Sequence, residues 1–242
     1  MSLLSRFRRP RAPEIWRGVY ERFEDVPASG KGFGASGWID GLVQELEIVR
    51  RGEWSEQWVV EHEVLLLLIR TQSIHVVDFG GAFGATLEYL RCIQPALQIR
   101  YDIIEIAPVV ERGPSLQPAA TFAASLDERH RRPDIVFVKS ALQYVADYRS
   151  MIRALFELDA QHVLFEKFSG VDCETYASAQ VNMDGSAVPC WFISTAEVVE
   201  IAGECGYDVA LRRRLLREYD QSAFEPRQRM GNARTLLFEK RK

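Results

Sequence analysis

Long hydrophobic runs are missing from this sequence of 242 residues. The longest uninterrupted apolar stretch, Val64 to Ile69, is far shorter than the roughly 20 residues that a membrane-spanning helix needs. The arginine-rich start, MSLLSRFRRPRAP, is not followed by an apolar segment, so it lacks the pattern of a secretory signal. We interpret it as a solvated tail or as a contact for acidic lipid or a partner, and we expect no transmembrane segment.

Cysteines are few, and their spacing does not suggest a metal site. The four cysteines contain no C-x-x-C pair, so neither zinc binding nor a disulfide framework is predicted. We expect no bound metal and reduced thiols, as in a cytoplasmic protein. These residues are Cys92, Cys173, Cys190 and Cys205.

Neither sign of charge dominates. The formal net charge is −4 and the pI is about 5.7, so the chain as a whole does not attract nucleic acid or an anionic membrane. Apolar residues make up 47% and charged residues 26%, values that are typical of globular proteins and exclude a disordered or fibrous chain. The length fits one α/β domain with an attachment.

The N-terminal part lacks a regular hydrophobic period before residue 36. Arg, Pro and Gly alternate there with aromatic residues, which predicts an irregular arm held down by its aromatic side chains. Two amphipathic helices are predicted next, one from Ser36 to Gly52 and one capped by Ser55. His62 lies on the apolar side of the second helix, where we expect a core residue. The aromatic anchors of the arm are Trp16, Tyr20 and Phe33.

After residue 70 short β-rich runs alternate with helical patterns at 85–93, 108–112 and 141–158. This alternation predicts a parallel sheet with helices on both faces. Two last strands, at 208–217 and 234–240, have no helix between them and should form an antiparallel hairpin. We therefore separate an N-terminal arm and helical preface, 1–70, from an α/β domain, 71–242. The earlier strands are Ile74 to Phe79, Ile99 to Ile106, Thr121 to Ala124, Asp134 to Lys139 and His162 to Phe168.

The first strand ends in a glycine-rich turn, VVDFGGAFGATLEYL, residues 76–90. Glycines allow close approach of a ligand, and the next helix directs free N–H groups to the same place. No G-x-x-x-x-G-K-[ST] phosphate loop is present. The dinucleotide pattern G-x-G-x-x-G would need glycines where Ala82 and Ala85 stand. The pattern D-x-G-x-x-x-G, by contrast, is met by Asp78, Gly80 and Gly84.

Acidic residues end the first two strands. Asp78 suits the ammonium of an amino-acid-like cofactor better than it suits a pyrophosphate. Glu105, 21 residues after Gly84, can accept hydrogen bonds from both hydroxyls of a ribose. The pattern favours S-adenosylmethionine; the alternative is that both acids cap nearby backbone N–H groups.

These motifs, the segment DIVFVKSALQYVAD and the terminal hairpin together resemble a class I S-adenosylmethionine-dependent methyltransferase. More narrowly, IWRGVY, VVDFGGAFG, SALQYV and PCWFIS in this order resemble a bacterial family of methyltransferase-like proteins often found with surface-polysaccharide genes. The resemblance covers most of the chain from Trp16 onward. It implies a Rossmann-like α/β fold with a seven-stranded, mostly parallel sheet of order 3-2-1-4-5-7-6, the last strand antiparallel, helices on both faces and an N-terminal helical extension. The implied cofactor residues are Asp78, Gly80, Gly81, Ala82, Gly84, Glu105, Leu126, Ser140 and Leu142.

The acceptor side is predicted from the direction of the strands. His75, His130 and His162 should lie at the edge opposite the cofactor, so a histidine base is not expected. At the cofactor edge, Glu166 is our candidate base and Tyr144 a residue that orients the acceptor. Long loops after the fifth and sixth strands are expected to complete the pocket. The candidate wall residues are Gln143, Lys167, Tyr176, Gln180, Asn182, Trp191, Tyr219, Arg227 and Arg229.

The sequence thus predicts methyl transfer from S-adenosylmethionine to a small polar acceptor, without specifying an oligomeric state. The resemblance implies a sugar or another precursor of a surface polysaccharide as the small-molecule partner; nucleic acid is not expected. One alternative is an NAD(P)-dependent oxidoreductase, which the glycine spacing disfavours. The other is a non-catalytic methyltransferase-like scaffold that makes contacts through Trp58, Trp191 or its arginine-rich ends.

Overall fold

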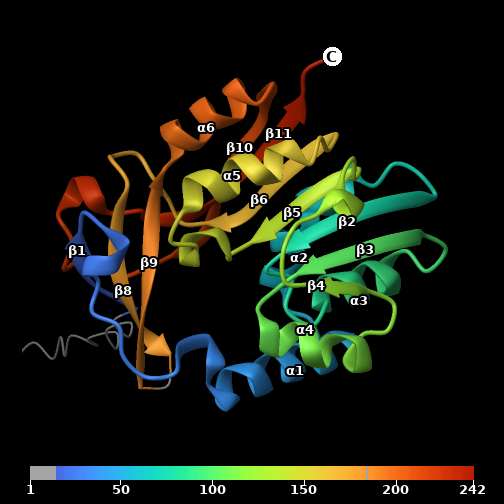
Figure 1. Cartoon of the computed structure of the whole chain (residues 1–242), viewed down its shortest axis with the longest axis horizontal. Coiled ribbons are helices and arrows are strands. Elements are labelled where there is room, and N and C mark those ends of the chain that lie inside the picture. The colour runs from blue at the N-terminus through green and yellow to red at the C-terminus, as the bar shows by residue number, and fades with distance from the viewer. Residues whose placement is uncertain (1–14, 184) are drawn as a thin grey trace, which may run out of the picture.

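Two β-sheets organise the chain in the computed structural model, which describes residues 15–183 and 185–242 (Figure 1). The larger sheet has seven strands in the order β10-β11-β6-β5-β2-β3-β4, and β11 runs antiparallel to both neighbours. This confirms the predicted order 3-2-1-4-5-7-6. The strands are β2 (Ser73–Phe79), β3 (Gln98–Ile104), β4 (Thr121–Ala123), β5 (Ile135–Lys139), β6 (His162–Phe168), β10 (Tyr207–Glu218) and β11 (Asn232–Lys240). The arginine-rich start lies outside the described residues.

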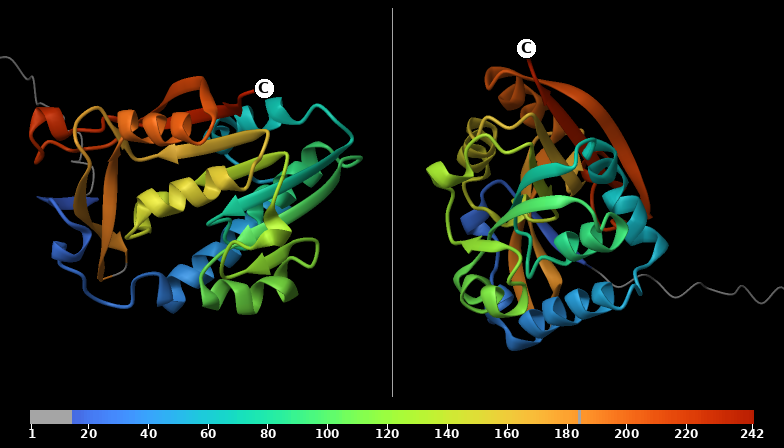
Figure 2. Two further views of the ribbon diagram at one scale, coloured as in Figure 1. Left: turned by 45° about the horizontal axis from the view of Figure 1, so that its top comes forward. Right: turned by 90° about the vertical axis from the view of Figure 1, so that its right-hand side faces the viewer.

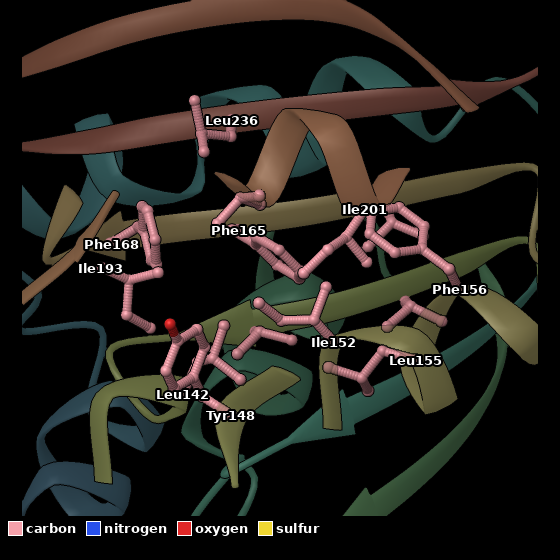
Figure 3. Close-up of a cluster of buried hydrophobic side chains, with 14 of the residues drawn as sticks. Leu142, Tyr148, Ile152, Leu155, Phe156, Phe165, Phe168, Ile193, Ile201 and Leu236 are labelled. Carbon is pink, nitrogen blue, oxygen red and sulfur yellow. The ribbon is translucent and has the colours of Figure 1, made fainter. Parts of the chain in front are cut away.

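The central strands are apolar on both faces because each face is covered by other elements. On one face, Phe165 packs with the buried Ile152 of α5 (Tyr148–Glu157) and Ile201 of α6 (Thr195–Glu204) (Figure 3). Val136 belongs to the same buried cluster. On the opposite face, Val76 and Phe137 pack with Leu65 and Leu87 of α2 (Glu56–Leu68) and α3 (Ala85–Ile93). The predicted helices on both faces are thereby confirmed.

The predicted helical preface forms two helices, α1 (Ser36–Arg50) and α2, that pack against the elements around the larger sheet. Ser55 caps α2, and its hydroxyl oxygen accepts the Trp58 N–H at 3.2 Å. The buried Leu46 of α1 shares a cluster with Phe83, before α3, and Val109 of α4 (Ala107–Leu116). In the described part of the chain, none of the helices combines the length and apolar character needed to cross a bilayer.

The prediction of an irregular N-terminal arm is wrong over five residues. Trp16–Tyr20 forms strand β1, which pairs antiparallel with β8 (Tyr176–Met183). Trp16 is buried between Phe192 and Tyr219, with ring centroids 5.1 Å away in both contacts. The partner strand lies about 160 residues away in the sequence, so no local pattern identifies it.

The long loop predicted after the fifth strand is also largely wrong, because most of it is β-structure. β8 and β9 (Ser186–Ser194) form an antiparallel hairpin, and β9 also pairs with the short strand β7 (Gly170–Val171). The sequence between β8 and β9 contains Asp-Gly, a common hairpin signal. The resulting second sheet, β1-β8-β9-β7, stands beyond the carboxyl ends of the parallel strands (Figures 1 and 2).

Candidate cofactor and acceptor site

The glycine turn after β2 has a backbone shape that only small residues allow. Gly80 and Gly84 have φ angles of 76° and 77°, in the left-handed region that favours glycine. The Gly80 N–H donates to the Ile104 carbonyl at 2.9 Å, and a Cβ at Gly80 would clash with Ala141. Gly84 begins α3 at its N-cap position. The turn is therefore fixed against both β3 and the loop after β5.

Asp78 lies directly beneath this turn. Its side chain is buried, and its Oδ2 accepts a hydrogen bond from the Tyr101 hydroxyl at 2.6 Å. A Cβ at Gly81 would stand 2.5 Å from the same oxygen, so glycine keeps the carboxylate open to the cavity. Burial raises the pKa of Asp78 to about 7, while the Tyr101 hydrogen bond and the charge of Lys139 act in the opposite direction.

Glu105 follows β3, which ends at Ile104 rather than at the predicted Ile106. Its carboxylate accepts hydrogen bonds from the Ala82 N–H at 3.1 Å and the Ile106 N–H at 2.8 Å. Burial raises the pKa of Glu105 above its ordinary value. The acid thus caps backbone N–H groups, as the alternative interpretation held, and it also lines the cavities described next.

Two cavities of different character meet at this turn. The first, of about 510 Å³, is polar at its floor, where Asp78 and Glu105 lie. The second, of about 340 Å³, is mainly apolar and includes Phe79 and Met151. Phe33, before α1, and Trp38, in α1, line both cavities, and their ring centroids are 5.0 Å apart. The residues shared by the two cavities also include Gly80, Glu105, Ser140 and Tyr144.

Tyr144 lines these two cavities and also a third. The predicted helix from 141 to 158 is divided here into a 3-10 turn (Leu142–Tyr144) and α5. The Tyr144 hydroxyl donates to Gln180 Oε1 at 2.7 Å, so this ring links the turn to β8. The third cavity, of about 210 Å³, is lined by Gln143, Tyr144, Lys167, Gln180, Asn182 and Tyr219, among others.

Strained backbone collects around the same cavities. Ala82, Ser140 and Lys167 have positive φ angles of 49°, 58° and 52° although each carries a side chain. Such a conformation costs about 1–3 kcal/mol per residue and persists where the surroundings enforce it. Ser140 directly follows β5 and Lys167 is the last residue but one of β6, and the Ser140 N–H donates to the Glu166 carbonyl at 3.1 Å. The positive φ angles thus occur where the Ser140 and Lys167 side chains line the first and third cavities.

An ion-paired cluster at this edge escaped the sequence prediction. Glu61 of α2 is buried, and its Oε1 lies 3.1 Å from Lys167 Nζ and accepts a hydrogen bond from Gln57 at 2.9 Å. Its Oε2 lies 3.9 Å from Nζ of Lys139, and the same Nζ lies 3.9 Å from the ring centre of Trp58. All five residues line the first cavity. Lys139 ends β5, much as Asp78 and Glu105 lie at the ends of their strands. Its position at a strand end could therefore have identified Lys139 as a site residue from the sequence.

His62 lies behind this cluster, and its prediction as a core residue is confirmed. The side chain is fully buried, and its Nδ1 donates to the Trp58 carbonyl at 2.7 Å. Its Nε2 is therefore an acceptor, at 3.1 Å from the Thr86 hydroxyl and 3.5 Å from Lys139 Nζ. Burial lowers the pKa of His62 well below its ordinary value, so the ring is neutral.

Glu166, the candidate base, lies elsewhere. Its side chain is fully buried beneath the sheet edge, where Oε1 accepts a hydrogen bond from the Thr235 hydroxyl at 2.9 Å. Arg213 approaches Oε2 to 3.8 Å, and burial raises the pKa of Glu166 to about 7. Successive residues of a strand point to opposite faces, so Lys167 reaches the cavity whereas Glu166 turns toward β11. We correct the prediction accordingly.

Several other predicted site residues are packed outside the three cavities. Leu142 and Trp191 lie in the hydrophobic core, where the Trp191 indole N–H donates to the Ala146 carbonyl at 3.1 Å. Leu126 packs partly buried against the same core. Tyr176 and Arg227 line a separate groove beside the second sheet, and the Arg229 guanidinium donates to the Phe224 carbonyl at 2.9 Å.

Solved structures of known proteins show which proteins share this fold. The chain matches no protein-family profile and no curated protein sequence. It is similar to the solved structure of an S-adenosylmethionine-dependent methyltransferase from Clostridium acetobutylicum, with a TM-score of 0.54 and 9% identity over 84% of this chain and 99% of that chain.

Two further solved structures contain bound ligands. S-adenosylmethionine-bound CalS10, an amino pentose methyltransferase from Micromonospora echinaspora, has a TM-score of 0.54 and 12% identity over 80% of this chain and 95% of that one. The 1,6-didemethyltoxoflavin N1-methyltransferase of Burkholderia thailandensis contains bound 1,6-didemethyltoxoflavin and S-adenosylhomocysteine. Its TM-score is 0.50, with 14% identity over 90% of this chain and 95% of that one. The fold is thus that of class I S-adenosylmethionine-dependent methyltransferases.

Proposed function

We propose that this chain is an S-adenosylmethionine-dependent methyltransferase that acts on a small polar acceptor. This proposal rests mainly on the observation that Asp78, the turn at Gly80 and Glu105 lie where a cavity with acidic groups meets a more apolar one. S-adenosylmethionine has the same division, with a charged amino acid part, a ribose and an apolar adenine. When bound, it would supply an electrophilic methyl group on a sulfonium.

Residues around the turn can be assigned to the ammonium, ribose and adenine parts of this cofactor. Asp78, held by Tyr101 and left open by Gly81, would bind the ammonium, and a cation there would lower the raised pKa of this acid and keep it ionised. Glu105 would accept the ribose hydroxyls through the lone pairs that its backbone donors leave free. Phe79 and Met151 would contact the adenine in the apolar cavity. Gly80, Ala82 and Ser140 complete the proposed cofactor site, with Gly84 as the N-cap of α3.

The third cavity supports a polar acceptor. Gln143 is buried there, and its Nε2 donates to the Ser140 carbonyl at 2.9 Å. Its Oε1 has no hydrogen-bond partner among the residues that the structure describes. A buried oxygen of this kind is costly unless a donor reaches it, and a hydroxyl or amine of the acceptor would be that donor. Tyr144, Lys167 and Tyr219 would form the neighbouring walls.

For the acceptor itself we propose a sugar or another precursor of a bacterial surface polysaccharide, methylated in the cytoplasm. The sequence resemblance supports this choice, and an amino pentose methyltransferase is among the proteins of similar fold. In this proposal the helical preface covers the site of the 71–242 domain, since Phe33, Trp38 and Trp58 line the first cavity. Arg227, in the separate groove, has no part in the proposed pocket.

Isothermal titration calorimetry tests the cofactor assignment. S-adenosylmethionine and S-adenosylhomocysteine should bind at micromolar concentrations, whereas NAD(H) and NADP(H) should not. Binding of a nicotinamide cofactor alone would overturn the proposal and favour an oxidoreductase. Transfer of labelled methyl from S-adenosylmethionine into fractionated native extract then tests turnover. Cofactor binding without transfer into any fraction would instead indicate a non-catalytic module.

A further inference from the structure

Lysine is rare in this chain, and two of its lysines meet at the candidate site. Only five of the 30 Lys and Arg residues are lysines: Lys31, Lys139, Lys167, Lys240 and Lys242. Lys139 and Lys167 both line the first cavity. Arginine keeps its charge and binds anions through a rigid fork, whereas a buried lysine amine can lose its proton. A chain that uses arginine almost everywhere else thus places titratable amines here.

The two lysines differ in how far Glu61 compensates them. Lys167 Nζ lies 3.1 Å from Glu61 Oε1, an ion pair that Gln57 supports with its hydrogen bond to the same oxygen. Lys139 Nζ lies 3.9 Å from Oε2, beyond hydrogen-bond distance. Glu61 is therefore mainly the partner of Lys167, and Lys139 is the less compensated of the two amines.

Burial makes the Lys139 amine easier to deprotonate than an exposed lysine. Burial lowers its pKa, and the charge of Lys167 acts in the same direction. The carboxylates of Glu45, Glu61 and Asp78 oppose this shift without reversing it. The charged and titratable groups that face Lys139 are thus Glu45 of α1, Glu61 and the neutral His62 of α2, Asp78 of β2 and Lys167 of β6.

The geometry also orients the amine. A neutral lysine has two N–H bonds and one lone pair. His62 Nε2, at 3.5 Å, and Glu61 Oε2, at 3.9 Å, both act only as acceptors from the side of α2. An N–H bond directed at His62 Nε2 leaves the lone pair of a neutral Lys139 free to face the first cavity, where the side chain is 18% exposed. This cavity shares Tyr144, Lys167 and Gln180 with the third cavity, in which the acceptor is proposed to bind.

On the basis of the proposed methyltransferase function, we propose that Lys139 is the general base and that the acceptor is a hydroxyl or amine that must lose a proton. The acceptor O–H or N–H bond breaks, and its proton goes to Lys139 Nζ. The acceptor atom bonds to the methyl carbon while the carbon–sulfur bond breaks and the sulfur keeps the electron pair. The products are the methylated acceptor, neutral S-adenosylhomocysteine and a Lys139 ammonium, so charge balances.

The same neighbours would stabilise the ammonium that this step forms. The Trp58 ring at 3.9 Å provides a cation–π contact, and Glu61 provides a carboxylate. Both are in place before the proton arrives, so little reorganisation is required. The ammonium then returns its proton to solvent when the product leaves. Lys167 is a positioning residue in this scheme, since it holds Glu61.

Labelling of the amines tests the proposal without turnover. The full chain is treated with trace acetic anhydride from pH 6 to 11, and acetylation of Lys139 and Lys240 is compared by peptide mass spectrometry. Lys240, in an ion pair with Asp159 outside the site, is the internal reference. The labelling midpoint of Lys139 should lie at least about 1 pH unit lower, and S-adenosylhomocysteine should slow its labelling. A Lys139 midpoint equal to or above that of Lys240 would overturn the proposal.

Substitution tests the role in methyl transfer, with the extract fraction that receives label as substrate. Lys139→Arg keeps the charge and the Trp58 contact but cannot act as a base. It should bind S-adenosylhomocysteine within about threefold of wild type, while the single-turnover rate falls by about 10²- to 10⁴-fold. Added methylamine should partly restore Lys139→Ala, and Lys240→Arg should transfer methyl like wild type.

The outcomes separate this inference from the proposed function. If Lys139→Arg transfers methyl at the wild-type rate with the same pH profile, the assignment of the base is wrong although the protein is a methyltransferase. If wild-type protein binds no S-adenosylhomocysteine, the proposed function fails, and the general-base proposal that rests on it fails with it.

Discussion

The two halves of the candidate site are built in different ways. The cofactor half comes from two adjacent parallel strands and the turns that follow them, with Asp78, Gly80 and Glu105 all within 28 consecutive residues. The acceptor half is assembled from separate parts of the chain: Glu61 on α2, Tyr144 after β5, Lys167 on β6 and Gln180 on β8. One half is continuous in sequence, and the other depends on tertiary packing.

This difference predicts different sensitivities to substitution. In the proposed cofactor half a backbone conformation and two carboxylates would do the binding, so a single added methyl group would block it. In the acceptor half the contacts are spread over several elements, and each contributes a modest share. The cofactor half should therefore respond strongly to small changes, and the acceptor half should respond weakly.

Gly80→Ala should give the largest effect. The added Cβ would clash with Ala141 at a φ of 76°, so the turn must move. We expect the affinity for S-adenosylhomocysteine to fall by more than about 100-fold and the free energy of unfolding by about 2–4 kcal/mol. Calorimetric titration and urea denaturation measure the two changes.

Gly206→Ala is the matched control, because Gly206 has a φ of 86° but nothing within 4 Å of the added Cβ. It should cost about 1 kcal/mol of unfolding free energy and leave cofactor affinity unchanged. Equal losses of affinity in the two variants would show that stability alone, and not the turn, governs binding.

Asp78→Asn should give the next largest effect. It keeps an oxygen for the Tyr101 hydroxyl but removes the charge, so affinity for S-adenosylhomocysteine should fall by about 10- to 100-fold. Since the pKa of Asp78 is raised to about 7 in the folded chain, wild-type affinity should increase between pH 6 and 8 as the acid ionises. The variant should lose this increase, which titrations at three pH values would reveal.

The same pKa predicts an opposite change in stability. An unfolded Asp loses its proton near pH 3.8, whereas folded Asp78 keeps it until about pH 7. Its contribution to the stability of the cofactor-free protein is thus complete below about pH 4 and is lost as the pH rises through 7. The difference in unfolding free energy, wild type minus Asp78→Asn, should fall by about 2–4 kcal/mol over this range. A constant difference would contradict the raised pKa.

Most of the larger sheet could be predicted from sequence because its signals are local. Each buried strand is a short apolar run, and the pattern from Asp78 to Gly84 fixes the first turn without reference to distant residues. The second sheet could not be predicted in this way, since Trp16 pairs with Gln180 across most of the chain. Only the Asp-Gly dipeptide between β8 and β9 gave a local sign of that hairpin.

The candidate site follows the same rule. Strand ends identify Asp78, Glu105 and Lys167, because position along a strand determines which edge a residue occupies. Position at the edge of the sheet does not determine which face a side chain takes, so it did not show that Glu166, the predicted base, is buried toward β11. Glu61 was beyond prediction, because a buried acid on an apolar helix becomes meaningful only when two lysines from other strands approach it.

Tyr144→Phe should give the smallest effect and tests the acceptor half. The ring remains in all three cavities, but Gln180 Oε1 loses its donor at 2.7 Å, so the free energy of unfolding should fall by about 1 kcal/mol. Cofactor affinity should stay within about twofold, whereas the Michaelis constant for the acceptor should rise by about three- to tenfold.

Tyr148→Phe provides the comparison, because it removes a similar hydroxyl, bonded to Glu197 at 2.8 Å, from a side chain in the core beside the site. Its loss of stability should be similar, and its Michaelis constant should not change. If Tyr144→Phe weakens cofactor binding as much as Asp78→Asn does, the two halves act as one unit, and the distinction between a local and an assembled half does not hold. If only the Michaelis constant for the acceptor changes, the contact from Tyr144 to β8 belongs to the acceptor half. Affinity for the acceptor is then distributed over weak contacts from elements that are distant in sequence.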